Sequence, residues 1–188
     1  MSAGAARGPA RGAGAARTTV RPARAAEAAL LAALGARTFR EAYGKHTPEA
    51  DLEAYIASTY SARAQALELV APDQACFLAR RAREPIGFAL LGSDEPAPAC
   101  VPARDAAIQL KRIYVVQDAW GSGAGSLLLE ACMAEARARG FETLWLTAWS
   151  ENHRALAFYG RHRFVRVGTH PFRLGSLTFL DPVLARPV

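Results

Sequence analysis

A long stretch in the second half of the chain carries apolar residues at a helical period, and a compact apolar run follows it. Residues 123–139 predict a helix with its small and apolar side chains on one face. These side chains belong to Ala124, Leu127, Leu128, Ala131, Ala134 and Ala138. Residues 144–149 are typical of a strand buried on both faces. With a strand predicted at 107–116, residues 107–149 form a β-α-β unit with a parallel strand pair.

Shorter patterns predict the remaining elements. A strand at 18–21 precedes an alanine-rich helix that presents Leu30, Leu31 and Leu34. A second helix starts after Thr47 as the capping residue, with Pro48 at its first position. Further strands are predicted at 75–80, 85–91, 164–167 and 177–184, with a proline-rich loop at 92–104 and a short helix at 152–161. This order of elements predicts an α/β fold with a central mixed sheet flanked by helices.

Composition narrows the class of protein. The 188 residues are 51% apolar and 21% charged, which predicts one soluble globular domain over residues 18–188. No segment has the roughly 18 consecutive apolar residues of a membrane-spanning helix, so we expect no membrane role. Cys76, Cys100 and Cys132 are scattered without CxxC spacing, which argues against a disulfide framework and against a zinc ribbon or other metal site. We therefore expect a reducing, cytoplasmic location.

The net charge of +6 is concentrated at the N-terminus. Residues 1–24 hold five arginines and no acid, whereas the rest has 18 basic and 17 acidic residues. A nearly neutral folded part argues against specific nucleic-acid binding. Residues 1–17 consist mainly of Ala, Gly and Arg and contain no Leu, Ile or Phe, which predicts a disordered tail. The tail also lacks the apolar features of a transit peptide or a secretion signal.

A glycine-rich turn lies between the strand at 107–116 and the helix that follows. It reads WGSGAGS, with Gly121, Gly123 and Gly125 at alternate positions. Glycines let the backbone approach a ligand closely, and the first amides of a helix have no internal partner, so the turn suits a phosphate or pyrophosphate. A plain tight connection remains the alternative. The GxGxG spacing, without an acid about 20 residues on, disfavours a nicotinamide cofactor, and the lack of a following Lys excludes a P-loop.

A second signal follows the strand at 144–149. Asn152 and Tyr159 lie seven residues apart, which is close to two helical turns, so they share one helix face. Ala155 between them leaves room for a ligand. Because ligands of open α/β sheets bind at the carboxyl ends of strands, the glycine turn and Tyr159 are expected at one crevice. Asn152 is equally suited to cap the helix, and Tyr159 to half-buried packing.

These motifs resemble those of the GCN5-related N-acetyltransferase (GNAT) superfamily. Residues 113–126, IYVVQDAWGSGAGS, look like its acetyl-CoA motif, and residues 152–164, NHRALAFYGRHRF, resemble its next motif. Residues 37–44, RTFREAYG, and 167–184, VGTHPFRLGSLTFLDPVL, are similar to PaiA-like polyamine N-acetyltransferases. The resemblance covers the chain from Thr18 onward and implies a twisted mixed sheet with two splayed parallel strands.

The resemblance also implies where acetyl-CoA binds and which residues act. The pantetheine arm would lie between the splayed strands, and an amide near Tyr114 or Val115 would polarise the acetyl carbonyl. Asn152 would contact the pantetheine, and Tyr159 would protonate the departing thiolate of CoA. The implied cofactor-binding residues are Tyr114, Val115, Val116, Trp120, Gly121, Ser122, Gly123, Ala124, Gly125, Ser126, Asn152 and Tyr159.

The chain departs from the family pattern at three places. Related enzymes often carry a Glu in the strand before the glycine turn, but residues 108–112 read IQLKR, so the base that deprotonates the amine is open. Trp120 stands where Gln or Arg is commoner, and Ser176 stands where the polyamine group usually has Asp. Asp181 is interpreted as an ion-pair partner of an arginine. Candidate bases are Glu41, Glu151, His153 and His170.

We therefore expect acetyl transfer from acetyl-CoA to a primary amine by direct attack in a ternary complex. A polyamine or similar small amine is the leading acceptor. The acidic residues near the first helices would favour binding of such a polycation, and a solvent-exposed helix face explains them equally well. Protein N-termini or lysines are the alternative acceptors, and the oligomeric state allows a homodimer. A non-catalytic domain that senses acyl-CoA is the alternative of another class.

Overall fold

The computed structural model describes residues 17–188, and a seven-stranded mixed sheet is its central element. The disordered tail predicted for residues 1–17 lies outside this range except for Arg17. The strand order is β1-β2-β3-β4-β5-β7-β6, and every neighbouring pair is antiparallel except β4 and β5. The strands are β1 (Thr18–Pro22), β2 (Gln74–Arg81), β3 (Glu84–Gly92), β4 (Ala107–Val115), β5 (Thr143–Thr147), β6 (Val165–Leu174) and β7 (Leu177–Pro187). The predicted α/β class and the parallel strand pair are confirmed.

Helices cover the sheet and complete the core. They are α1 (Ala28–Tyr43), α2 (Glu49–Thr59), α3 (Ala62–Val70), α4 (Ala124–Ala138) and α5 (His153–Arg161), with short 3-10 helices η1 (Ala25–Glu27), η2 (Arg104–Ala106) and η3 (Gln117–Ala119). Helix α4 packs against β1 to β4, whereas α1 packs against β3 and β4. No helix within residues 17–188 is both long and apolar enough to cross a membrane.

Three features of the helices differ from the sequence prediction. Helix α3 has no predicted counterpart, because its buried residue is Gln65 and it carries no apolar stripe. Helix α2 begins at Glu49 with Pro48 as N-cap, so Thr47 is not the capping residue. In α4, Leu129 and Met133 are buried while Leu127 is 38% exposed, so the long side chains orient the helix and the predicted alanine-rich face is partly wrong.

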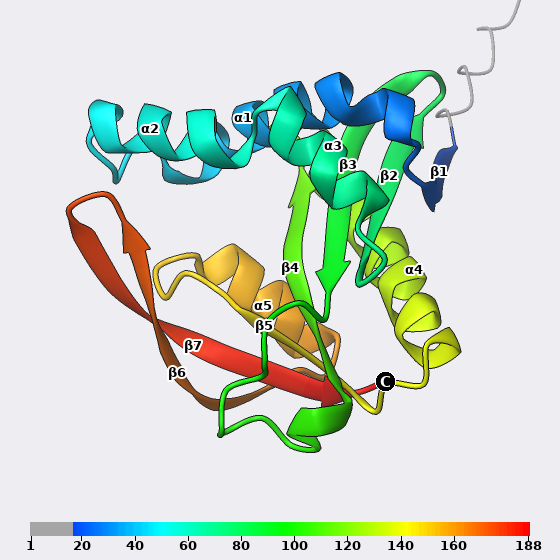
Figure 1. The fold of residues 1–188 in the computed structure, drawn as a ribbon. Coiled ribbons are helices and arrows are strands. Elements are labelled where there is room, and N and C mark those ends of the chain that lie inside the picture. The colour runs from blue at the N-terminus through cyan, green and yellow to red at the C-terminus, as the bar shows by residue number, and fades with distance from the viewer. Residues whose placement is uncertain (1–16) are drawn as a thin grey trace, which may run out of the picture.

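The sheet opens between its two parallel strands. Strand β4 pairs with β5 only from Ala107 to Gln109, so residues 110–115 of β4 have no partner in β5. On its other side β4 has a register shift against β3, where Leu90 opposes Arg112 but Leu91 opposes Leu110. Such a bulge bends a strand and increases its twist. Figure 1 shows the result, with β2 to β4 roughly upright and β6 and β7 crossing below them.

Candidate active site

The turn between η3 and α4 has the backbone geometry that the glycine spacing predicts. Gly121 and Gly123 have φ of +77° and +82°, a region that other residues adopt at a cost. A Cβ atom on either would meet nothing within 4 Å, so the turn faces open space. Gly125 lies inside α4, where a Cβ atom would stand 3.4 Å from the Phe158 ring of α5. The first amides of α4 therefore point from a tightly packed helix end towards an accessible surface.

A cleft of about 460 Å³ lies beside this turn. Its walls are β4, the glycine turn and α5, and Tyr159 of α5 is among the lining residues. Of the predicted cofactor-binding residues, eight line this cleft: Val115, Trp120, Gly121, Gly123, Ala124, Gly125, Ser126 and Tyr159. Val116 is buried, and its amide donates a 2.9 Å hydrogen bond to the carbonyl of Ile86. Ser122 places its Oγ 3.4 Å from the Ala124 amide.

Trp120 and Arg154 form one wall of the cleft. The Trp120 indole Nε1 donates a 2.8 Å hydrogen bond to the Val115 carbonyl, and the Arg154 guanidinium carbon lies 3.2 Å from the centre of the indole ring. Partial burial lowers the pKa of Arg154 from its ordinary value. Arg161, two helical turns further along α5, lines the same cleft. Sequence reasoning missed both arginines, although their spacing of seven places them on one helix face.

A smaller pocket of about 120 Å³ adjoins the cleft on the side of α1. It is lined by α1, β4 and the segment that follows β5, and it includes Glu41, Tyr43, Tyr114, Trp149 and Asn152. Six residues line both the pocket and the cleft: Ile113, Val115, Trp120, Arg154, Ala155 and Tyr159. The two spaces therefore meet between β4, the glycine turn and α5, and we call the smaller one the α1 pocket.

Tyr159 lies where these two spaces meet, and Asn152 lines the α1 pocket. Tyr159 is 8% exposed, and burial raises its pKa well above the usual value, so the phenol is protonated at neutral pH. Asn152 caps α5 through its Oδ1, which accepts a 3.0 Å hydrogen bond from the Ala155 amide. The structural role of Asn152 is thus present, and it leaves the residue on the wall of the α1 pocket.

Aromatic side chains crowd the α1 pocket. Phe39 stacks on Tyr43 at 4.5 Å and on Tyr55 at 4.6 Å between ring centres. Tyr43 lies 5.3 Å from Trp149, measured between ring centres. Burial raises the pKa of Tyr114 to about 12, so this phenol also stays neutral. The wall of the pocket therefore combines uncharged aromatic rings, among them Tyr43, Tyr114 and Trp149, with charged side chains, which belong to Glu41, Lys111, Arg112 and Arg154.

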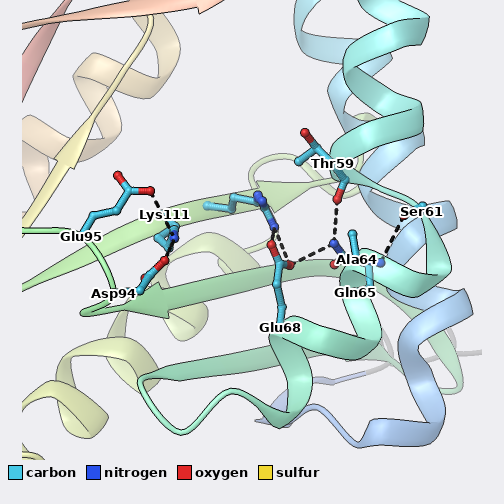
Figure 2. A network of polar contacts seen from close by, with 9 residues as sticks. Thr59, Ser61, Ala64, Gln65, Glu68, Asp94, Glu95 and Lys111 are labelled. Carbon is cyan, nitrogen blue, oxygen red and sulfur yellow. Dashed lines mark hydrogen bonds and ion pairs between the residues drawn. The ribbon is translucent and has the colours of Figure 1, made fainter.

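A buried ion pair joins α3 to β4 next to these rings. The Arg112 Nη1 donates to both oxygens of Glu68, at 2.8 and 2.7 Å, and Gln65 Nε2 donates to Glu68 at 2.9 Å. Figure 2 shows Glu68 and Gln65 in this network, next to Lys111 with Asp94 and Glu95. Burial is the largest influence on the pKa of Arg112 and lowers it, but the Glu68 hydrogen bond together with the charge interactions of Glu68, Tyr60 and Tyr55 gives a net rise of this pKa. The Glu68 carboxylate thus lies close to β4, where its charge is neutralised by Arg112.

The candidate bases lie in different surroundings. Glu41 lines the α1 pocket, with its carboxylate bound by Arg37 Nε at 2.8 Å and by the Gln117 amide at 2.9 Å. Glu151, His153 and His170 are exposed.

Asp181 of β7 was predicted to pair with an arginine, but no such ion pair occurs among residues 17–188. It is 3% exposed and accepts a 3.2 Å hydrogen bond from the Ser150 amide. Burial raises the pKa of Asp181 above the usual range for a carboxyl. Within the same residues, no three His, Cys, Asp or Glu side chains cluster as metal ligands.

Comparison with solved structures finds the same fold in other proteins. PaiA N-acetyltransferase from Thermoplasma acidophilum, solved in complex with coenzyme A, aligns with a TM-score of 0.76 at 18% identity, covering 92% of this chain and 99% of that one. A GCN5-related N-acetyltransferase from Rhodopseudomonas palustris aligns with a TM-score of 0.70 at 18% identity, covering 95% and 100%. At these identities, the likeness concerns the fold.

Sequence relatives point the same way. An uncharacterized N-acetyltransferase of Mycobacterium tuberculosis (strain H37Rv) is 29% identical over 156 residues, which are 83% of this chain and 94% of the relative. An uncharacterized N-acetyltransferase of Lactobacillus delbrueckii subsp. lactis is 24% identical over 77% of this chain and 82% of its own length. The model of the acetyltransferase (GNAT) family matches residues 36–164, which include β4, the glycine turn and Tyr159. With more than half of its length matched, this chain belongs to the GNAT family and is an acetyl-CoA-dependent N-acetyltransferase.

Proposed function

We propose that this enzyme transfers an acetyl group from acetyl-CoA to a small primary amine, with a polyamine as the leading class of acceptor. The observation that carries the proposal is the meeting of the cleft and the α1 pocket at Tyr159. Two substrates that enter from these two spaces reach each other through the gap between β4 and β5. Attack therefore occurs directly within a ternary complex.

The cleft suits acetyl-CoA, which is a long molecule with negatively charged phosphates. The open turn at Gly121 and Gly123 presents main-chain amides at the positive end of the α4 dipole, which favours a diphosphate. Arg154 and Arg161 add positive charge on the facing wall. Residues 110–115 of β4 lack a strand partner on the β5 side, so their backbone groups on that side can pair with the pantetheine arm, apart from the Val115 carbonyl, which accepts from Trp120 Nε1. Asn152 and the amides near Tyr114 and Val115 complete the proposed set.

Tyr159 acts as the general acid in the proposed reaction. The neutral amine nitrogen forms a bond to the thioester carbon and gives up one proton to water, the carbon–sulfur bond breaks, and Tyr159 supplies the proton that the leaving thiolate takes up. The Tyr159 phenolate then regains a proton from water. A thiol has a reference pKa near 8.5, and burial between β4 and β5 raises the pKa of the thiolate as it does that of the phenol. The pKa values of the CoA thiol and of the Tyr159 phenol therefore stay closer to each other than they would if only the phenol were buried. This favours transfer of the Tyr159 proton at the same time as the carbon–sulfur bond breaks.

The walls of the α1 pocket support an alkylammonium acceptor. Faces of Tyr43 and Trp149 attract organic cations, and the pocket carries the carboxylate of Glu41. A peptide N-terminus or lysine is the alternative acceptor, and a homodimer stays a prediction. The free thiols of Cys76, Cys100 and Cys132 support the proposed cytoplasmic location.

Release of CoA thiol tests this function. The full chain is mixed with acetyl-CoA and, separately, with spermidine, 1,4-diaminobutane, ethylamine and a lysine peptide, and free thiol is followed with a disulfide reagent. We expect the small amines to release thiol faster than the peptide. Calorimetry measures CoA binding in parallel. Binding of CoA without thiol release for every amine would contradict the proposal and favour an acyl-CoA sensor.

A further inference from the structure

The acceptor amine must lose a proton before it attacks, and β4 offers no carboxylate for this step. An alkylamine has a pKa of about 10.4, so only roughly 0.1% of it is neutral at pH 7.5. Residues 108–112 of β4 carry no Asp or Glu. Two of the carboxylates near the α1 pocket are already engaged, Glu41 by Arg37 and Gln117 and Glu68 by Arg112.

Asp181 is the remaining buried carboxylate on this side of the sheet. It is 3% exposed, and within residues 17–188 its side chain accepts a hydrogen bond from the amide of Ser150, at 3.2 Å. Among residues 17–188, no Arg, Lys or His forms an ion pair with Asp181, and His170, its cross-strand neighbour on β6, is exposed. Burying a carboxylate without a counter-ion costs several kcal/mol, so such a group is more often found at functional sites than elsewhere.

Neighbouring residues on β7 and after β5 relate Asp181 to the α1 pocket, whose lining residues do not include Asp181 itself. Phe179 lies two residues before Asp181, so both side chains project from one face of β7. The Phe179 ring lies 6.3 Å from Trp149, and Trp149 lies 5.3 Å from Tyr43, with both distances between ring centres. Trp149 and Tyr43 line the α1 pocket, and Asp181 is near enough to Tyr43 to raise the pKa of its phenol, after burial and Tyr114. Ser150, which holds Asp181, directly follows Trp149.

We propose that Asp181 binds the ammonium group of the acceptor and takes up its proton before the nitrogen attacks the thioester. One N–H bond breaks and one O–H bond forms, so an ammonium and a carboxylate become a neutral amine and a carboxylic acid. The neutral amine then carries the lone pair that forms the new bond to carbon. This inference rests on the proposed acetyl transfer and adds the acceptor-binding group to it.

The alternative is that Asp181 only holds the segment before α5 through Ser150. Asp181→Asn separates the two roles, because an amide oxygen still accepts the Ser150 hydrogen bond but cannot take up a proton. Asp105→Asn is the matched control, since Asp105 is exposed in η2. The probe is a pair of amines of similar shape: ethylamine, which is protonated at pH 7.5, and 2,2,2-trifluoroethylamine, which is largely neutral there.

We expect Asp181→Asn to lower kcat/KM for ethylamine by about 100-fold or more, as loss of a general base does. For trifluoroethylamine, which needs no deprotonation, the loss should stay within about tenfold. CoA affinity by calorimetry should match that of the wild type, and Asp105→Asn should match the wild type with both amines. An equal loss for both amines, or no loss for ethylamine, would overturn the role of Asp181 and leave acetyl transfer standing.

Two further outcomes are decisive. If the wild type releases no CoA with any amine, the acetyl transfer itself fails, and the role of Asp181 with it. If Asp181→Asn also loses CoA affinity, Asp181→Glu decides, because it keeps a carboxylate on β7. Recovery of CoA affinity and ethylamine turnover in Asp181→Glu supports proton uptake. Loss of both in that variant shows a structural role and overturns the proposal.

Discussion

Glu68→Ala should destabilise the enzyme strongly, because it breaks a buried ion pair between elements distant in sequence. The substitution removes two hydrogen bonds from Arg112, at 2.8 and 2.7 Å, and one from Gln65, at 2.9 Å. The Gln65 amide keeps its 3.0 Å hydrogen bond to the Thr59 carbonyl, but the Arg112 charge is left without a partner. Arg112 also lies under Tyr60, with 5.3 Å between its guanidinium carbon and the ring centre.

The size of the effect follows from the burial of the pair. Removing one partner of a buried ion pair costs about 3 to 5 kcal/mol. The side chains of Arg112 and Glu68 are 13% and 19% exposed, so some water reaches them and the lower end of that range applies. A loss of about 3 kcal/mol in the free energy of unfolding lowers Tm by roughly 6 to 12 °C in a chain of this size.

Thermal and urea unfolding, followed by circular dichroism, measure this loss. Glu135→Ala is the matched control, since Glu135 pairs with Arg139 at the C-terminal end of α4 and both are more exposed, so its loss should be about 0.5 kcal/mol. The double variant Glu68→Leu with Arg112→Met should recover much of the stability, because apolar side chains replace both charges. A loss below about 1 kcal/mol for Glu68→Ala would refute the reasoning from burial.

Three further predictions concern the catalytic acid, the glycine turn and acid stability. Tyr159→Phe should lower kcat by about 100-fold or more while CoA affinity by calorimetry changes little, because the ring stays and only the proton donor is lost. Gly123→Ala should weaken CoA binding. A φ of +82° costs Ala about 1 to 2 kcal/mol, so the backbone of the turn relaxes and its amides move. Gly140→Ala is the control: Gly140 has φ of +81° but lies beyond α4, so this variant should leave CoA binding unchanged. The Arg21 hydrogen bond lowers the pKa of Glu27 from 4.5 to about 2, so its stabilising effect is full above pH 4.5 and is lost as pH falls towards 2.

Each of these predictions has a contrary result. Equal losses of turnover and CoA affinity in Tyr159→Phe would count against the role of acid. Equal CoA affinities in Gly123→Ala and wild type would show that the turn does not hold the diphosphate. Urea unfolding between pH 5 and 2 checks Glu27, and Glu27→Gln should flatten the decline; a decline as steep as that of the wild type would assign it to other carboxyls.

Local features of the chain were predictable because neighbouring residues decide them. Glycine permits the positive φ values found at Gly121 and Gly123, and the Asn152 cap needs only the Ala155 amide three residues away. The β-α-β unit follows from its apolar pattern. Helix α3 escaped detection, since Gln65 rather than an apolar stripe is its buried residue.

The site depends more on contacts between distant segments. Glu68 meets Arg112 across 44 residues, and Asp181 meets Ser150 across 31, so no local pattern marks either carboxylate as buried. The charge of Asp181 by itself predicts an ion pair with an arginine, because the sequence does not show how deeply the residue is buried. Arg154 and Arg161 line the cleft because α5 packs beside the glycine turn, which the sequence does not show.

The sequence by itself determined the turn that presents main-chain amides, the cap of α5 and the family to which the chain belongs. Backbone dihedral preference and capping act over a few residues, and those residues are visible in the chain. Only the tertiary structure decided that β4 leaves β5 after Gln109, at the bulge opposite Leu90 and Leu91, and that the cleft and the α1 pocket meet there. Strand register and burial of a lone carboxylate result from packing among elements far apart in sequence, because each depends on what the other strands and helices leave open.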